Sequence, residues 1–186
     1  MRKKFSKLVF TAFVAGGFLL VFGNTLTFAK GSEFVYLGGG VGALNTDAKF
    51  VSLQITSHSE NIKNYLAPYG LQGQFEWSLF GVRGDGLDSN DVAIIGFSPV
   101  LRFVPKNTKS FFEFGIGPYL FSERMLNKDN GVGTAFEFGS LAGFGLRLGE
   151  NSNAELGYRI MHFSNAGMTS FNPGVNIHQI RFGYRF

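Results

Sequence analysis

A histidine and a serine near the end of the chain have the residue types and the spacing of a hydrolytic pair. His162 and Ser164 are two residues apart in the segment 161–167, and the chain then ends in an alternation of apolar and polar residues over 180–186. Side chains of a strand repeat every two residues, so in a strand both groups point to the same face. The combination predicts hydrolytic chemistry carried on the wall of a membrane barrel.

The first 29 residues have the composition of a secretory signal peptide. Basic residues stand at positions 2, 3, 4 and 7, residues 8–22 are almost wholly apolar, and Thr-Phe-Ala at 27–29 offers a small-residue cleavage site. A single transmembrane anchor is the alternative, although glycines weaken a helix across this run. We therefore expect a signal peptide at 1–29 and an outer-membrane barrel at 30–186.

Removal of the signal peptide makes the chain electrically neutral. The segment carries four of the 17 basic residues and none of the 13 acidic ones, which leaves 13 of each sign. The isoelectric point near 9.4 therefore does not indicate a nucleic-acid partner. The chain has no cysteine, and its three histidines show no metal-ligand spacing, so we expect no disulfide, metal or cofactor.

Period-two alternation recurs eight times along the rest of the chain, with turn-forming residues between the repeats. The predicted strands are 33–44, 47–57, 71–83, 91–104, 110–122, 133–148, 153–164 and 175–186. Each is long enough for the roughly 9–11 residues that cross a bilayer at a tilt. Aromatic residues on one face and polar or glycine residues on the other are typical of an eight-stranded barrel with a filled lumen. The predicted fold class is all-β, an eight-stranded antiparallel transmembrane β-barrel, with a soluble β-sandwich as the alternative.

The even number of strands, with both ends in the periplasm, makes the odd-numbered strands run outward. External connections are then expected at 84–90, 123–132 and 165–174, and tight periplasmic turns at 105–109 and 149–152. The connection 45–46 is short for an external loop, and 59–70 is long enough to hold a brief helix. In the lumen, Glu113 and Glu137 are expected to pair with Arg102 or Arg147.

The seventh predicted strand places His162 and Ser164 on its lipid-facing side, in phase with the apolar residues that precede them. Polar groups are costly on such a face unless they are used. The eighth strand carries Asn176 and His178 in the same phase. A symmetric hairpin would set Asn176 across from Ser164 and His178 across from His162. We expect the four side chains to cluster where the outer leaflet's glycolipid head groups meet the barrel.

At these residues the chain resembles the PagL-type lipid A 3-O-deacylase (acyloxyacyl hydrolase) family. The match rests on His162-x-Ser164-Asn165-Ala166-Gly167, on Asn172-Pro173-Gly174 and on the terminal strand. The resemblance implies an eight-stranded barrel in the outer membrane of a Gram-negative cell. It also implies hydrolysis, without a metal, of an ester-linked acyl chain on lipid A, the membrane anchor of lipopolysaccharide in the outer leaflet.

Carried over from the family, Ser164 is the nucleophile and His162 its general base, the usual division of labour in acyl transfer. The tetrahedral intermediate needs hydrogen-bond donors aimed at its oxyanion. The Asn165 side chain and the backbone amides of Ala166 and Gly167 are the nearest candidates in the sequence.

One position departs from the family. The family places a glutamate at the start of the last strand to orient the histidine, and an ungapped match puts Asn176 there; no Asp or Glu follows Glu155. An asparagine can hold a histidine tautomer by hydrogen bonding, although it stabilises an imidazolium less than a carboxylate does. Asn165, Asn172 and His178 are the other candidates for this orienting role.

The last strand also resembles the aromatic-alternating ending that outer-membrane barrels present to the barrel-assembly machinery, with Phe186, Tyr184, Phe182 and Ile180 on one face. Two alternatives to an active enzyme stay open. One is a catalytically silent member of the same barrel group. The other is a small structural or adhesive barrel in which His162 and Ser164 anchor the last hairpin at the membrane interface.

Overall fold

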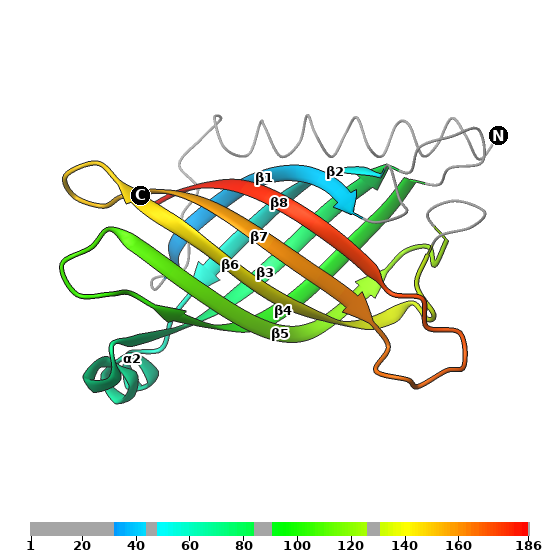
Figure 1. The fold of residues 1–186 in the computed structure, drawn as a ribbon, viewed down its shortest axis with the longest axis horizontal. Helices are drawn as coiled ribbons and strands as arrows, with labels where there is room; N and C mark the ends of the chain where they lie inside the picture. Colours follow the sequence, from blue (N-terminus) through cyan, green and yellow to red (C-terminus); the bar gives the residue numbers. More distant parts are fainter. Residues whose placement is uncertain (1–31, 44–47, 84–90, 126–130, 186) are drawn as a thin grey trace.

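The computed structural model describes residues 32–43, 48–83, 91–125 and 131–185. They form one closed barrel in which each strand pairs antiparallel with its neighbours in the chain and β1 closes on β8 (Figure 1). The strands are β1 Ser32–Ala43, β2 Lys49–Ser57, β3 Leu71–Arg83, β4 Asp91–Phe103, β5 Ser110–Phe121, β6 Phe136–Leu148, β7 Ala154–Ser164 and β8 Val175–Tyr184. The predicted fold class is confirmed. The expected signal peptide, the connections 45–46 and 84–90, and Phe186 lie outside the described residues.

The outer surface of the barrel is a band of large apolar side chains. Among its members, Trp77, Phe114 and Ile180 are each more than half exposed. The others include Ile95, Leu101, Phe112, Ile116, Leu120, Phe144, Leu146, Leu156, Ile160 and Phe182. A continuous apolar surface of this extent is stable against lipid and not against water, so the barrel is a transmembrane one. No helix in the described part of the chain is long and apolar enough to cross a bilayer.

The lumen contains a layer of buried ion pairs between three glutamates and three arginines. Arg159 donates to Glu76 at 2.6 Å and to Glu113 at 2.6 Å, and Arg181 contacts the same two carboxylates at 2.9 and 2.7 Å. Arg102 completes the layer with bonds to Glu113 and Glu155, both at 2.9 Å. The three positive charges of the layer therefore balance its three negative charges.

Two sequence expectations about the lumen have different outcomes. The pairing of Glu113 with Arg102 is confirmed. The pairing expected for Glu137 is wrong, because its Oε1 accepts a hydrogen bond from the Thr134 backbone amide at 2.7 Å. Arg147 instead contacts Glu155 at 3.3 Å. Glu137 is the second residue of β6, and the backbone just before this strand supplies its hydrogen-bond donor.

The other layer of the lumen is apolar and lies toward the end of the barrel that carries the 165–174 loop. On β3 the inward residues change from Glu76 to Phe80, and on β7 they change from Arg159 to Phe163. Aromatic rings from four strands meet there in edge-to-face contacts, which are favourable for their quadrupoles. This aromatic layer closes the lumen directly behind the outer wall of β7. We call this end of the barrel the loop end.

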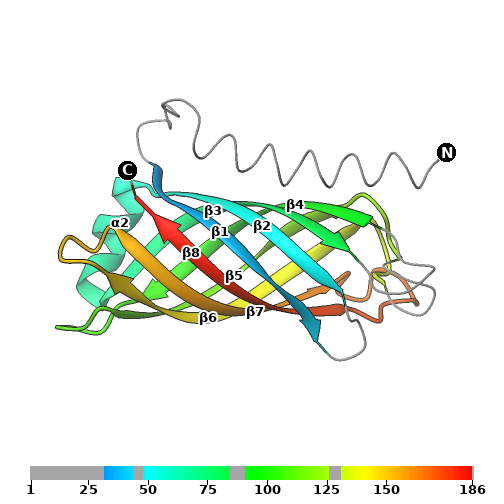
Figure 2. The ribbon, with the colours of Figure 1, turned by 90° about the horizontal axis from the view of Figure 1, so that it is seen from above.

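The opposite end carries the short turns 104–109 and 149–153, and we call it the turn end. The long connection between β2 and β3 contains helix α2, Glu60–Leu66, followed by the 3-10 helix η1, Ala67–Tyr69, so the expected brief helix is confirmed. Figure 2 shows α2 at this end of the barrel. Ile62 and Leu66 pack over Gly73 of β3, where a Cβ atom would come within 2.6 Å of Ile62.

We predict that Glu113→Gln destabilises the barrel by about 3–5 kcal/mol, because it leaves three buried arginines short of one negative charge. The measurement is urea unfolding of the refolded barrel in detergent or bilayers, followed by heat-modifiable migration on gels. Glu123→Gln makes the same chemical change at an exposed loop position and serves as the control. Equal unfolding midpoints for the two variants would show that the buried layer does not stabilise the barrel.

Candidate active site

Phe163 fixes the direction of the two residues on either side of it. Its ring is fully buried in the aromatic layer, with ring centroids 5.0 Å from Tyr119 and 5.4 Å from Phe121. Because neighbouring side chains of a strand alternate, His162 and Ser164 must both point to the outer wall. The structure agrees, since His162 is exposed and Ser164 half-buried. The expected lipid-facing phase of β7 is thus explained by one buried aromatic residue.

His162 and Asn176 form the hydrogen-bonded pair of the site. They lie directly opposite each other on β7 and β8, and His162 Nδ1 is 2.7 Å from Asn176 Oδ1. An amide oxygen only accepts, so the pair defines Nδ1 as the protonated nitrogen and leaves Nε2 with its lone pair. The register expected from the sequence for a symmetric β7–β8 hairpin is wrong by two residues. Ser164 lies just beyond the last paired residues, Phe163 and Val175, and His178 is opposite Ile160.

Ser164 lies on the same strand and the same face as His162, one strand repeat closer to the loop end. Among the residues that the structure describes, none is hydrogen-bonded to the Ser164 hydroxyl. Hydrogen bonds between a nucleophile and its base are often long before substrate binds. The Ser164 side chain therefore has the position of a nucleophile beside His162 without the closed contact.

A second serine, Ser140, lies across from His162 on the other side. It is directly opposite His162 on β6, on the outer face, and half-buried. Ser140, His162 and Asn176 therefore form a polar row over three neighbouring strands. The one sequence signal for Ser140 is that it is a serine in phase with Phe136, Phe138 and Phe144, on a face that is otherwise apolar. It is the rival of Ser164 as the partner of His162.

The segment 165–174 is held by the side chain of Asn165, which is fully buried. Its Nδ2 donates to Thr169 Oγ1 at 2.8 Å and to the Phe171 carbonyl at 3.3 Å, and its Oδ1 accepts from the Gly167 amide at 3.0 Å. The Asn165 backbone amide donates to Asn172 Oδ1 at 3.1 Å. Asn165, Asn172 and Gly167 thus stabilise the loop.

These hydrogen bonds occupy some of the donors that the sequence predicts for binding an oxyanion. The Asn165 side chain and the Gly167 amide are both occupied within the loop. The Ala166 amide has no hydrogen-bond partner among the described residues, and Ala166 has a left-handed backbone with a φ of 53°. Ala166 is also exposed. Of the three candidate donors, the Ala166 N–H is therefore the one that is free to bind a developing oxyanion.

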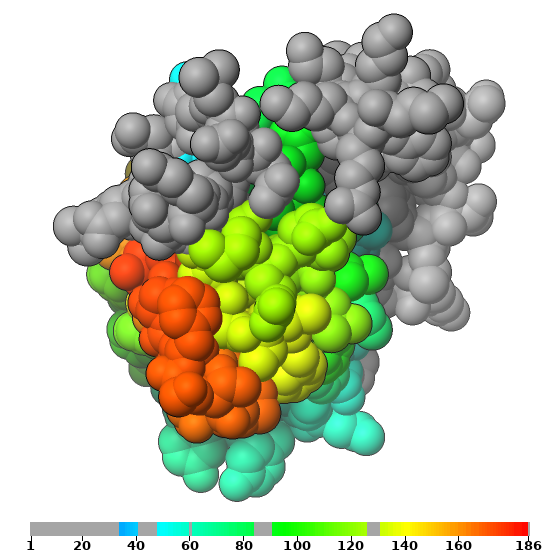
Figure 3. Space-filling view, turned by 90° about the vertical axis from the view of Figure 1, so that its right-hand side faces the viewer, coloured from blue at the N-terminus to red at the C-terminus, as the bar shows by residue number. Residues whose placement is uncertain are grey.

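Two glycines permit the close packing of this end. Gly174, with a φ of 69°, lies against the imidazole, and a Cβ atom there would be 2.8 Å from His162 Cε1. Gly133, in the segment before β6, lies under the 165–174 loop, where a Cβ atom would be 2.1 Å from the Phe171 carbonyl oxygen. Figure 3 views this end, with the orange segment against the yellow-green one. The segment that precedes β6 therefore packs against the 165–174 loop and supports it.

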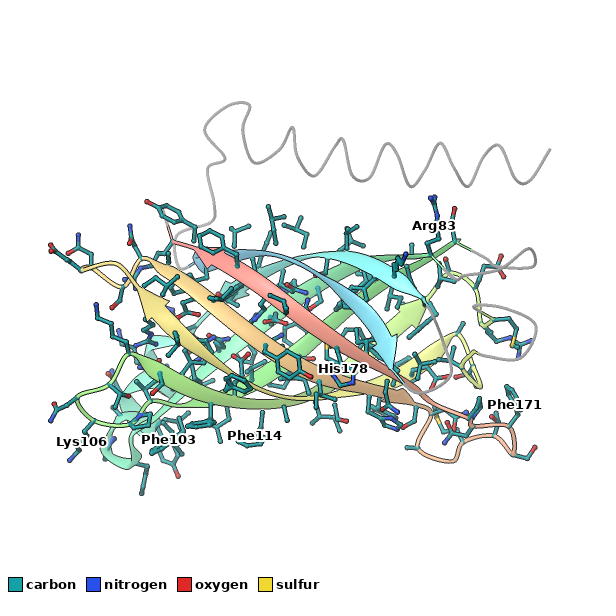
Figure 4. The ribbon with its side chains drawn as sticks, turned by 45° about the horizontal axis from the view of Figure 1, so that its top comes forward. Arg83, Phe103, Lys106, Phe114, Phe171 and His178 are labelled. Atoms are coloured by element: carbon teal, nitrogen blue, oxygen red, sulfur yellow. The ribbon has the colours of Figure 1, made fainter. Side chains whose placement is uncertain are left out.

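His178 does not share in the contacts of His162. It lies one strand repeat further from the loop end than Asn176, and its Nδ1 is hydrogen-bonded to the Tyr158 hydroxyl on the outer wall. Figure 4 shows His178 on the wall and Phe171 beyond it at the loop end. Of the four side chains expected to cluster, His162, Ser164 and Asn176 lie at neighbouring positions and His178 forms a separate pair. In the described part of the chain, no group of three His, Asp or Glu side chains has the spacing to hold a metal ion.

Comparison with known proteins gives a family model and curated relatives that share one description. Residues 51–185 match the family model described as lipid A 3-O-deacylase (PagL). The lipid A deacylase PagL of Bordetella bronchiseptica is 40% identical over 76 residues, which span 41% of each chain. The lipid A deacylase PagL of Pseudomonas aeruginosa is 31% identical over 88 residues, 46% of this chain and 49% of the relative. The matched segments thus span less than half the length of these two relatives.

The solved structures agree on the fold. The crystal structure of the outer membrane enzyme PagL superposes with a TM-score of 0.66 at 22% identity, covering 82% of this chain and 99% of that one. A de novo designed transmembrane β-barrel superposes with a TM-score of 0.53 at 8% identity, covering 86% of this chain and 98% of the design. The family model covers well over half of the sequence and includes all the residues of the site. The chain therefore belongs to the lipid A 3-O-deacylase (PagL) family.

Proposed function

We propose that this protein is an outer-membrane esterase that removes an ester-linked acyl chain from lipid A in the outer leaflet. The observation that carries the proposal is the His162–Asn176 hydrogen bond beside Ser164 on the outer wall. A soluble ester could reach a serine anywhere on a protein surface. A serine and histidine on the lipid-facing side, at the rim of the apolar band, suit an ester whose acyl chain stays in the membrane.

The reaction proposed for this site has two steps. Ser164 Oγ attacks the ester carbonyl carbon while His162 Nε2 accepts the hydroxyl proton, and Asn176 holds the opposite ring nitrogen. The oxyanion of the tetrahedral intermediate accepts a hydrogen bond from the Ala166 amide. Collapse breaks the bond to the sugar oxygen, which takes the proton from His162. Water activated by the same histidine then hydrolyses the acyl-serine and releases the free fatty acid.

Asn176 in place of the family glutamate has a defined consequence for the histidine. The amide oxygen fixes the ring orientation and the tautomer, which are the geometric parts of the orienting role. It adds no negative charge beside the imidazolium that forms in each step. We infer that the site is catalytically competent and that its turnover is limited by weaker stabilisation of that imidazolium.

We predict that Ser164→Ala lowers deacylation of lipid A by about a thousandfold or more while the barrel stays folded, because the nucleophile is lost. The measurement is mass spectrometry of lipid A after incubation with the purified, refolded protein. Ser140→Ala is the matched control and should leave the rate within about twofold. Loss of activity in Ser140→Ala with retention in Ser164→Ala would transfer the role of nucleophile to Ser140. An unmodified lipid A profile with the unsubstituted protein would favour a silent or structural barrel.

We predict that Asn176→Glu raises turnover by about tenfold, because a carboxylate stabilises the imidazolium as well as orienting it. Asn176→Leu should lower turnover by on the order of a hundredfold, since it removes the 2.7 Å hydrogen bond to His162 Nδ1. Initial rates on purified lipid A, compared at equal amounts of heat-modifiable barrel, make the measurement. Equal rates for all three proteins would mean that Asn176 does not orient the base. His178→Leu is the control at the neighbouring polar position.

We also propose that β8 is the segment read by the barrel-assembly machinery. Ile180, Phe182 and Tyr184 alternate outward along β8, and the same phase continues to Phe186. Deletion of Phe186 should lower the amount of folded barrel in the outer membrane by about tenfold while export to the periplasm continues. Cell fractionation with heat-modifiable migration is the measurement. Wild-type amounts of folded barrel would contradict the proposal.

A further inference from the structure

The turn end of the barrel carries an apolar groove on its outer wall, far from the His162 pair. The groove holds about 500 Å³ and lies between helix α2 and strands β3–β5. Ile62 and Leu66 of α2 form one side. The wall is formed by Phe75, Pro99, Leu101, Phe114 and Ile116, and these apolar side chains continue into the lipid-facing band. Figure 4 shows Phe114 and Phe103 directed outward at this end.

A polar hollow of about 260 Å³ lies beside the groove, at the mouth of the lumen. The two hollows meet at Gly73 and Gln74, which line both. Three cationic side chains from separate elements line the polar hollow: Lys63 of α2, Arg147 of β6 and Arg185 after β8. None of the described residues that line it is acidic. We call this hollow the cationic mouth.

The described lining of the cationic mouth carries more positive than negative charge. Arg147 is offset by Glu155 at 3.3 Å, whereas Arg185 donates to the Asn151 carbonyl at 3.4 Å. Lys63 and Arg185 are exposed, so an anionic oxygen can reach both side chains.

We propose that the groove and the cationic mouth together bind one anionic phospholipid of the inner leaflet. An acyl chain lies along the groove under α2, and the phosphate lies near Lys63 and Arg185. The apolar continuity with the lipid-facing band favours a hydrocarbon chain over a protein partner as the occupant. The exposed Tyr65 and Tyr69 are residue types that favour the membrane–water interface, which places α2 at head-group level.

The test is native mass spectrometry of the purified full-length barrel with stoichiometric phosphatidylglycerol, phosphatidylcholine or glycerol phosphate. We expect one retained phosphatidylglycerol, with at least about tenfold weaker retention of phosphatidylcholine, because each cation near a lipid phosphate contributes to binding. Glycerol phosphate alone should bind weakly, since it has no chain for the groove. Equal retention of the two lipids, or binding of glycerol phosphate as strong as that of phosphatidylglycerol, would overturn the proposal.

Two pairs of variants locate the lipid. Leu101→Trp fills the groove, and Leu146→Trp makes the same change on the outward face of β6. Lys63→Gln with Arg185→Gln removes two cations of the mouth, and Lys106→Gln with Lys109→Gln removes two exposed cations of the 104–109 turn. The first variant of each pair should lose about tenfold in phosphatidylglycerol retention and the second should not. Equal retention within each pair would contradict the assigned site. All four should deacylate lipid A at the unsubstituted rate, so the outcome is independent of the proposed esterase.

Discussion

The buried ion layer of Glu76, Glu113, Arg159 and Arg181, extended by Arg102 to Glu155, is the interaction on which the structure depends. A narrow barrel has inward positions on every strand and no water to solvate charges placed there. Arginine forks satisfy several carboxylate oxygens at once, so each carboxylate of the layer is shared between strands far apart in the sequence. The pairs specify which strands lie across the lumen from one another and which face of each strand is inside.

A filled lumen leaves the outer wall as the place for chemistry. The aromatic layer takes Phe163 inward, and the residues on either side of it are carried to the lipid side together. The antiparallel ladder then sets Asn176 beside His162, and the loop held by Asn165 presents the Ala166 amide near Ser164. The hydrolytic site that we propose requires no cavity inside the barrel. It needs a rigid wall and a substrate that lies in the membrane beside that wall.

Much of this arrangement could be predicted from the sequence because strand periodicity is local. Eight alternating segments gave the strands to within a few residues, and the phase of β7 gave the outward direction of His162 and Ser164. The register between β7 and β8 could not be predicted, because the connecting loop allows one strand to shift along the other by two residues without changing which side chains face outward. The position of Ser140 beside His162 could not be predicted either, because only the pairing of β6 with β7 brings these two residues together. The use of Asn165 as a loop support depends on bonds to Thr169 and Phe171 that no spacing rule reveals.

We propose that His162, held by Asn176, activates Ser164 on the outer wall. Reaction of the refolded barrel with a long-chain alkyl fluorophosphonate tests it most directly, because this reagent forms a stable phosphonyl ester on an activated serine. Digestion and tandem mass spectrometry then locate the added mass. We expect the adduct on Ser164, with much slower labelling in His162→Ala. An adduct on Ser140, or no adduct in a correctly folded barrel, would contradict it.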